Sequence, residues 1–474
     1  MFDDEEDDEL FDDQFNSELE RFEAMVQTKE SYYFDSEVLE QIIDHFIIKN
    51  QVKQALMAIE FAKEQHPSLT VYDLRKAQIY STTGQLKESL LILQALEKND
   101  TSNPEIFITK ASVFSQLRDH DKAIKYYEKA IEAAEQYEDG EEIEDIRFDL
   151  ALEYENVHDY QSAIKVLTKI LETSPENEAA IYEVAYCYER IGNFDKCIEF
   201  YNKYIDNNPY SFTAWYNLGN IYFLKDNIEK ALWAYDYAIV INEDFSSAHF
   251  NMANTYMQTG EYEKALDSYK KCIEIDGEEA LTLSYLAESY ERLERYDEAL
   301  HYYQKSKDLN PELAEPWLGI GIIKEVQGFT KEALVHLNQA VRFQPENANY
   351  RLVYAECLYK DFQIAEAESE LEMAISLEAD YVEAIILLAT IKEDLDIVLA
   401  MKFLEQIPNL AILDTKVRLY LTALYYKVGR KTDALLLFKG EMNTDRNSAK
   451  TLLLYLPDAE QIPDFIQIIE SYND

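Results

Sequence analysis

The stretch Thr213–Val240, TAWYNLGNIYFLKDNIEKALWAYDYAIV, decides the fold of this chain. Trp215, Leu218 and Tyr222 follow the i, i+3, i+7 spacing of one helical face, and the run that begins at Ala231 repeats this logic on a second helix. Such a helix pair cannot bury its apolar faces alone. The stretch therefore predicts a unit that packs against further copies of itself.

A ladder of small residues shows that copies of this unit run along the chain. The ladder residues lie 34 positions apart, except for one interval of 40 and one of 33. A small side chain at this point lets two helix axes approach to the lower end of the usual range of about 8–10 Å. A fixed period of this length predicts a solenoid of stacked repeats. The ladder residues are Ala55, Ser89, Ala123, Ala163, Cys197, Ala231, Ala265, Ala299, Ala333, Ala367, Ala400 and Ala434.

Glycine and proline mark where the helices of each unit end. Glycine falls five residues before the ladder residue in five units, where a left-handed residue can end the first helix. Proline falls twelve residues after it in five units, where the second helix should stop. The glycines are Gly84, Gly192, Gly260, Gly328 and Gly429, and the prolines are Pro67, Pro175, Pro209, Pro311 and Pro345.

These units resemble the tetratricopeptide repeat. The family pattern at repeat positions 4, 7, 8, 11, 20, 24 and 27 is matched here by Trp215, Leu218, Gly219, Tyr222, Ala231, Tyr235 and Ala238. About twelve units fit between residues 36 and 440, with the fourth to ninth the clearest. The resemblance implies an all-α, right-handed superhelical solenoid of antiparallel helix pairs.

The two ends of the chain depart from the repeat. Residues 1–30 are predicted to be an acidic tail, disordered to about residue 14, followed by a capping helix with the stripe Phe15, Leu19, Phe22 and Val26. Residues 441–474 are predicted to form C-terminal capping helices that cover the last open face.

One repeat interval is longer than the others. It contains an insertion near residues 135–145, and we expect its six extra residues to lengthen the flanking helices around a loop at Gly140. This insertion is a candidate boundary between a block of three units and a block of nine.

Charge and composition exclude several classes of partner. The formal net charge is −48, which repels phosphate backbones and anionic membrane surfaces, so we expect no direct binding of nucleic acid. The longest apolar run, residues 384–391, is too short to cross a bilayer. The four cysteines are interpreted as buried hydrophobes in a reducing compartment, and the start of the chain has no secretory pattern. These observations predict a cytoplasmic protein without membrane insertion.

The sequence holds no motif for catalysis, for a cofactor or for a metal ion. There is no His-Glu-x-x-His, no Cys-x-x-Cys, no Walker loop and no Gly-x-Ser-x-Gly. Pairs of carboxylates carry little information in so acidic a chain. We therefore expect a protein that is not an enzyme, with no catalytic residue, no cofactor and no metal site.

The candidate site is the inner face of the first helices. Positions 2, 5, 9, 12 and 13 of these helices point away from the partner helix, and in tetratricopeptide proteins they line a groove that receives peptides. In units five to eight these and neighbouring positions form an aromatic floor with an amide centre and charged flanks. The predicted groove residues are Tyr182, Tyr186, Arg190, Tyr216, Asn217, Asn220, Phe223, Phe250, Asn251, Asn254, Met257 and Arg292.

The four asparagines of this groove form matched pairs one repeat apart. An asparagine side chain both donates and accepts, which suits an extended backbone bound without regard to its sequence. The pairs are similar to the asparagine ladder of O-GlcNAc transferases, although they cover only two units. The alternative is that they bond within the solenoid or to water. A carboxylate clamp of the chaperone-binding type requires a lysine at position 5, where Tyr216, Phe250 and Ser284 stand.

The function predicted from these features is a non-enzymatic scaffold that binds extended, basic or neutral segments of protein partners in the concave groove. One alternative is a regulatory or targeting subunit of an enzyme complex. Another is an acidic tail that mimics nucleic acid toward a basic nucleic-acid-binding protein. The eleven carboxylates of residues 1–20, and the nine Lys and Arg of residues 401–450, also predict weak head-to-tail self-association, unless the tail only keeps the protein soluble.

Overall fold

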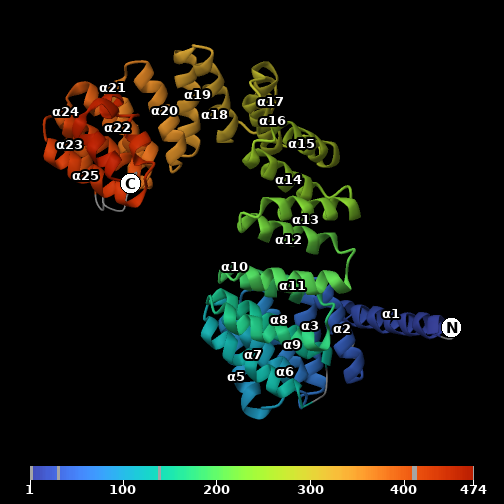
Figure 1. Ribbon diagram of the computed structural model, residues 1–474. Helices are drawn as coiled ribbons and strands as arrows, with labels where there is room; N and C mark the ends of the chain where they lie inside the picture. Colours follow the sequence, from blue (N-terminus) through green and yellow to red (C-terminus); the bar gives the residue numbers. More distant parts are fainter. Residues whose placement is uncertain (1–3, 29–31, 137–139, 408–413, 473–474) are drawn as a thin grey trace. The chain divides into compact units, whose positions relative to one another are not determined.

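A computed structural model describes residues 4–28, 32–136, 140–407 and 414–472 of the chain. Within these ranges the chain is helical, without a β-strand, and consecutive helices pair through short turns (Figure 1). It divides into two compact units, Met1–Asn208 and Pro209–Asp474, each of which is described by itself. The predicted fold class, an all-α solenoid of antiparallel helix pairs, is confirmed. The domain bounds drawn from the sequence stay a prediction.

The first unit contains α1 (Asp4–Thr28), α2 (Ser36–Ile48), α3 (Val52–Gln65), α4 (Val71–Thr82), α5 (Leu86–Asn99), α6 (Pro104–Gln116), α7 (His120–Ala134), α8 (Gly140–Asn156), α9 (Tyr160–Thr173), α10 (Glu178–Arg190) and α11 (Phe194–Asn207).

The second unit contains α12 (Phe212–Leu224), α13 (Ile228–Ile241), α14 (Ser246–Thr259), α15 (Tyr262–Asp276), α16 (Ala280–Arg292), α17 (Tyr296–Leu309), α18 (Ala314–Val326), α19 (Thr330–Phe343), α20 (Ala348–Lys360), α21 (Ile364–Leu377), α22 (Val382–Leu395), α23 (Ile397–Glu405), α24 (Thr415–Lys427), α25 (Lys431–Thr444), α26 (Ser448–Leu452), the 3-10 helix η2 (Pro457–Gln461) and α27 (Pro463–Ser471).

The ladder of small residues lies at the contact between the two helices of each pair. In every pair from α2/α3 to α24/α25 the ladder residue is the fourth residue of the second helix, and all twelve are fully buried. Gly219 shows how tight the approach is, because a Cβ built on it would lie 2.6 Å from the ring of Tyr235. The two helices of a pair can therefore pack this closely only because the residues at the crossing are small.

A left-handed residue ends the first helix of almost every pair. The five predicted glycines have φ between +72° and +85°. The same position is left-handed in six further pairs that carry no glycine there, and Phe362, at φ +63°, is the bulkiest of these residues. In the shortened pair α22/α23, Asp396 directly follows α22 and caps α23 by accepting a hydrogen bond from the Val398 amide at 2.8 Å. Local geometry, rather than glycine itself, is what the repeat preserves.

The turns between pairs are fixed by proline and by a side chain at repeat position 4. Each of the five predicted prolines lies two residues beyond the end of a second helix. The Trp215 indole N–H donates to the Pro209 carbonyl at 2.9 Å, and the Trp317 indole donates to the Pro311 carbonyl at 2.9 Å. Arg351 makes the same contact in its own turn. A donor at position 4 thus ties these three first helices, α12, α18 and α20, to the turn before them.

The N-terminal segment forms helix α1, which extends from Asp4 to Thr28. The side chains of residues 1–14 lie outside the described residues, so the disorder expected to about residue 14 stays a prediction. Carboxylates at a helix N-terminus face the positive end of its dipole, which favours the helix. The predicted capping stripe packs as expected, because Phe22 is buried and its ring lies 5.9 Å from that of Phe34.

The insertion lengthens one helix. The first helix of that pair, α8, has 17 residues, whereas α6 and α10 have 13 each. Gly140 is the first residue of α8 and not part of a loop, and residues 137–139 lie outside the described residues. The lengthening is confirmed, and the position of the loop is corrected.

The C-terminal helices cover the last pair. The predicted helices correspond to α26 and α27, with η2 between them. Phe465 of α27 is fully buried, and its ring lies 5.2 Å from that of Phe438.

Replacing Ala231 by leucine should overpack the contact between α12 and α13. We expect Ala231→Leu to lower the free energy of unfolding by about 1–3 kcal/mol, measured by urea denaturation. Glu229→Leu, at an exposed position of the same helix, should change it by less than about 0.5 kcal/mol. Equal stability of Ala231→Leu and the wild type would contradict the assigned register.

Phe362 should be a site where glycine stabilises the protein. Its side chain is 87% exposed and its backbone is left-handed, so Phe362→Gly removes strain at the cost of little packing. We expect a gain of about 0.5–1 kcal/mol in the free energy of unfolding. Gly328→Ala, at φ +83°, should show the opposite sign and a loss of about 1 kcal/mol. A loss of stability in Phe362→Gly would mean that its ring packs in solution.

Candidate functional site

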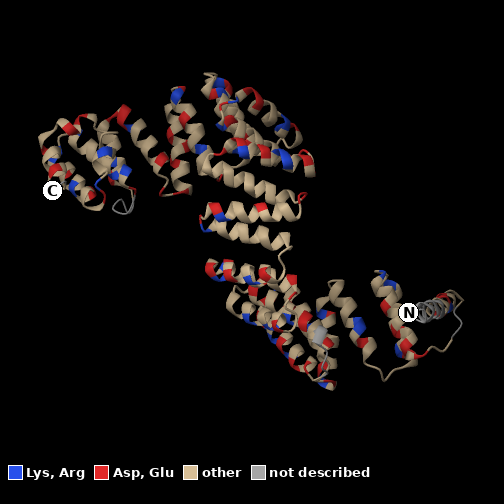
Figure 2. Cartoon of the chain, turned by 45° about the vertical axis from the view of Figure 1, so that its right-hand side comes forward, with Lys and Arg blue, Asp and Glu red and all other residues tan. Residues whose placement is uncertain are grey.

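Helices α12 and α14 of the second unit present the predicted aromatic and amide residues. Neither helix contains an Asp, Glu, Lys or Arg, which is unusual in a chain with 92 acidic and 44 basic residues. In Figure 2 these two helices are tan, without the red and blue segments that mark charged residues on other helices. The surface formed by α12 and α14 is called the uncharged groove below.

A hollow of about 260 Å³ lies at this groove. Three of the predicted residues, Tyr216, Phe250 and Asn251, line it together. The remaining lining comes from α14, from the end of α15 and from the start of α16, and consists of Ser246, Ser247, Cys272, Asp276, Glu279, Leu281 and Thr282.

Neighbouring aromatic rings pack against the two rings that line the hollow. The Tyr216 ring lies edge-on to Phe245, with ring centroids 5.1 Å apart. The Phe250 ring lies 5.6 Å from Tyr285 and 5.7 Å from Tyr269. Such edge-to-face contacts fix the ring orientations, and both half-buried rings line the hollow.

The amides at the centre of the groove bond to one another across two repeats. The Asn251 side-chain N–H group donates to Asn220 Oδ1 at 2.8 Å and to the Tyr216 hydroxyl at 3.0 Å. Asn220 Oδ1 also accepts a hydrogen bond from the buried Tyr235 hydroxyl at 2.8 Å. These bonds within the solenoid are the alternative that the sequence left open, and they orient the amides before any ligand arrives.

The other predicted residues of the second unit differ in how they are held. Asn254 accepts a hydrogen bond from the Tyr269 hydroxyl, which repeats the Tyr235 to Asn220 contact one period later. The sulfur atom of Met257 lies 3.0 Å from the Ser289 hydroxyl oxygen. Phe223 and Asn217 are half-buried, and the Asn217 side chain makes no hydrogen bond within the described part of the chain.

Charged residues return at the next first helix, α16. Arg292 is exposed and pairs with Glu288 at 3.3 Å. The Glu291 carboxylate accepts a hydrogen bond from the Tyr303 hydroxyl at 2.8 Å. Burial raises the pKa of Glu291 to about 7, and the bond from Tyr303 opposes this rise. The groove thus changes from uncharged to acidic between α14 and α16.

Three predicted residues belong to α10 of the first unit and form a cluster of their own. Tyr186 is 42% exposed, and its ring lies edge-on to Tyr160 at 6.3 Å. The Arg190 Nε atom donates to the Tyr160 hydroxyl at 3.3 Å. Tyr182 is half-buried. Tyr160 is therefore the centre of this cluster, although sequence reasoning did not select it.

Sequence reasoning also missed an aromatic pair on α13. Trp233 and Tyr237 are 44% and 43% exposed, and both pack on Trp215, at centroid distances of 5.0 Å and 4.6 Å. The sequence did contain a signal for this pair. Other units carry a polar residue at the position of Trp233, namely Glu199, Asp267 and His301, so a tryptophan there departs from the pattern.

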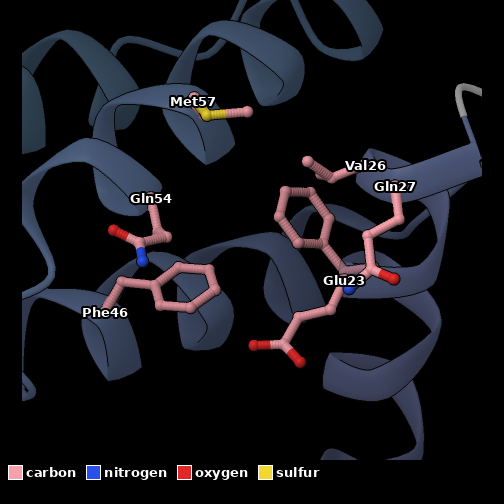
Figure 3. A pocket seen from close by; sticks show the side chains of 7 residues that line it. Glu23, Val26, Gln27, Phe46, Gln54 and Met57 are labelled. Atoms are coloured by element: carbon pink, nitrogen blue, oxygen red, sulfur yellow. The ribbon is translucent and has the colours of Figure 1, made fainter.

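A second hollow, of about 230 Å³, lies where α1 packs on α2 and α3. In Figure 3, Phe46 and Gln54 face Glu23, Val26 and Gln27 across it. The period gave no indication of this hollow, because α1 lies outside the repeats.

Three of the nine Lys and Arg of residues 401–450, the cations expected to attract the acidic tail, form ion pairs within the described part of the chain. Arg418 pairs with Glu441 at 2.6 Å, Lys427 with Glu393 at 2.8 Å, and Arg430 with Glu405 at 2.6 Å. The side chains of residues 1–14 lie outside the described residues, so the predicted self-association stays a prediction.

Two further searches cover the described ranges only. No group of three or more His, Cys, Asp or Glu side chains there is arranged to hold a metal ion. No helix there is both long enough and apolar enough to cross a membrane.

Family models match several parts of the chain. A model described as tetratricopeptide repeat matches residues 104–176 and 244–312, and one described as TPR repeat matches residues 219–260. A model for anaphase-promoting complex, cyclosome, subunit 3 matches residues 156–236. No curated protein matches the chain.

Several solved structures are similar to parts of the chain. YrrB, a TPR protein with an unusual peptide-binding site, is 22% identical, with 40% of this chain and 96% of YrrB covered and a TM-score of 0.31. A Cut9–Hcn1 hetero-tetramer of the APC/C is 14% identical, with 88% and 94% covered and a TM-score of 0.43. MamA is 26% identical, with 36% and 92% covered and a TM-score of 0.32.

The family models and the structure point to the same repeat. The matched segments fall on helix pairs whose ladder residues, left-handed turns and prolines keep one register. The chain is a tetratricopeptide repeat protein with about twelve repeats.

Proposed function

We propose that this chain is a non-enzymatic scaffold that binds extended segments of partner proteins in the groove of its repeats. The observation that carries this proposal is the uncharged groove, in which Tyr216, Phe250 and Asn251 line one hollow. Half-buried aromatic rings beside polar amides suit a peptide, which brings both apolar side chains and backbone hydrogen-bonding groups.

Charge supports basic or neutral partners. A net charge of −48 repels acidic segments at long range and attracts basic ones. At close range α12 and α14 carry no charge, so a bound segment need not strip water from an ionised groove residue. Direct binding of nucleic acid is disfavoured for the same electrostatic reason.

The contacts of Asn217 and Asn251 suggest separate roles for the two amides. Asn251 is engaged within the solenoid, where it joins α14 to α12. Asn217 lies on the same groove helix as Tyr216 and makes no hydrogen bond within the described part of the chain. We therefore propose Asn217 as the residue that binds the partner's backbone, and Asn251 as the one that holds the groove in shape.

A second candidate function is that of a regulatory or targeting subunit in a larger assembly. The match of residues 156–236 to a family model for a subunit of a multi-protein complex favours it. The four cysteines are free and buried, which supports a reducing compartment such as the cytoplasm. Co-purification of a tagged chain with a stoichiometric enzyme would distinguish this function from a scaffold with exchangeable partners.

Removing the aromatic floor should weaken peptide binding. We expect phage-displayed peptides selected on the wild-type chain to bind Tyr216→Ala/Phe250→Ala at least tenfold more weakly by calorimetry, which corresponds to about 1.4 kcal/mol or more. The loss follows from the apolar contact area that both rings offer to a ligand.

The matched control removes two aromatic rings from another surface. Trp233→Ala/Tyr237→Ala should leave the affinity of the same peptides unchanged, because these rings lie on α13 and do not line the hollow. Equal losses in both double variants would place the binding surface outside the uncharged groove.

Replacing each asparagine should show whether it contributes to peptide affinity alone or also to the stability of the fold. We expect Asn217→Ala to weaken selected peptides of unrelated sequence alike, by about 0.5–1.5 kcal/mol, without changing the melting temperature. Asn251→Ala should weaken them too, but with a lowered melting temperature, because it breaks two hydrogen bonds between repeats. An Asn217→Ala variant with full affinity for every peptide would remove the backbone-binding role.

A further inference from the structure

The hollow at the uncharged groove is lined by two chemically different kinds of side chain. The first kind is aromatic and consists of the rings of Tyr216 and Phe250. The second kind is acidic and consists of the carboxylates of Asp276, the last residue of α15, and Glu279, which directly precedes α16. Aromatic rings and carboxylates in one hollow favour a ligand group that is apolar along its length and cationic at its end.

The two carboxylates are available to a ligand. Both are exposed, and neither makes an ion pair or a side-chain hydrogen bond within the described part of the chain. Two lysines near these carboxylates already have partners of their own, because Lys271 pairs with Glu274 at 2.5 Å and Lys305 pairs with Glu278, the neighbour of Glu279, at 2.7 Å. No ion pair within the described part of the chain therefore neutralises Asp276 or Glu279.

The end of a helix adds to the negative potential. Asp276 closes α15, and the last carbonyl groups of a helix carry a partial negative charge. Gly277 follows in a left-handed conformation at φ +89°, so the chain turns away immediately after this carboxylate. The carboxylate of Asp276 and the last carbonyl groups of α15 thus add negative potential beside the hollow, whereas the partly positive N-terminus of α16 lies at Glu279.

We propose that this hollow holds an arginine side chain of the bound partner segment, with its methylene stem on Tyr216 and Phe250 and its guanidinium group at Asp276 and Glu279. The planar guanidinium stacks on aromatic rings and donates in a fork that matches carboxylates, whereas the lysine ammonium is a compact and strongly hydrated charge. Lysine is therefore the weaker occupant. This inference rests on the proposed function, since it names the side chain that the peptide groove selects.

The test uses the peptides themselves as probes. A random phage-displayed peptide library is selected on the wild-type chain and, in parallel, on Asp276→Asn/Glu279→Gln. The selection is done in about 0.15 M salt, where interactions between exposed charges are screened beyond about 8 Å. We expect arginine to be enriched at one position of the peptides selected on the wild type, and this enrichment to be lost on the variant. Replacing that arginine by neutral citrulline should weaken wild-type binding at least fivefold, and variant binding less than twofold.

A matched control separates a specific site from general attraction to an acidic protein. Glu263→Gln/Asp267→Asn removes the same number of exposed carboxylates from α15, the helix that ends at Asp276, at positions that do not line the hollow. It should keep both the enrichment and the fivefold effect of citrulline. Melting curves of both double variants check that each still folds.

The possible results separate the inference from the proposed function. Peptides that bind through Tyr216 and Phe250 but show no arginine enrichment, or an enrichment that survives in Asp276→Asn/Glu279→Gln, overturn the arginine site and leave the proposed groove standing. An equal loss in the control variant also overturns it, because the attraction is then not local. A selection that yields no peptide sensitive to Tyr216→Ala/Phe250→Ala overturns the proposed function itself.

Discussion

The close crossing of two helices at a small residue is the constraint on which the rest of this structure depends. The crossing recurs in every pair, and it leaves room for a large buried side chain four residues further along the second helix, which is a ring in some pairs and an aliphatic chain in others. In α12/α13 the Tyr235 ring lies directly against Gly219, where even a methyl group would collide with it. The fully buried ring then fills the space that the small residues open, so the pair is both tight and densely packed.

This core contact also shapes the groove. Because the Tyr235 ring lies across Gly219, its hydroxyl group reaches Asn220 one residue further along α12. Asn220 is thereby held as an acceptor for Asn251 of the following repeat. The same relation recurs between Tyr269 and Asn254. A chain of contacts thus runs from the buried helix crossing to the groove surface, and it preorganises the amides without a ligand.

The sequence predicted those features that depend on backbone geometry and on the period. Small residues at a crossing, glycine in a left-handed turn and proline after a helix each reflect a local steric requirement, which spacing alone reveals. The left-handed residues Phe362 and Asp226 were not predicted, because the surrounding pair imposes their conformation against their own preference.

Interactions between side chains were harder to predict, because they depend on which polar groups meet across repeats. Lys110 stands at a position where leucine is expected, and it is 2% exposed. Its ammonium group pairs with Glu97 and lies 4.4 Å from the centroid of the Tyr126 ring. Neither partner could be assigned from spacing, because both come from other helices. The bond between Asn220 and Asn251 was one of two open interpretations for the same reason.

The distribution of charge joins the fold to the proposed function. A solenoid keeps most of its side chains near solvent, so a surplus of carboxylates is tolerated where water screens them. Such a surplus inside a peptide groove would have a different effect, because each carboxylate that loses its water without a partner costs binding free energy. The groove helices α12 and α14 avoid this cost by carrying no charged residue, while Asp276 and Glu279 remain at the exposed edge of the hollow. The acidic surface then attracts basic segments from a distance, and the choice among them falls to the few groups that line the groove.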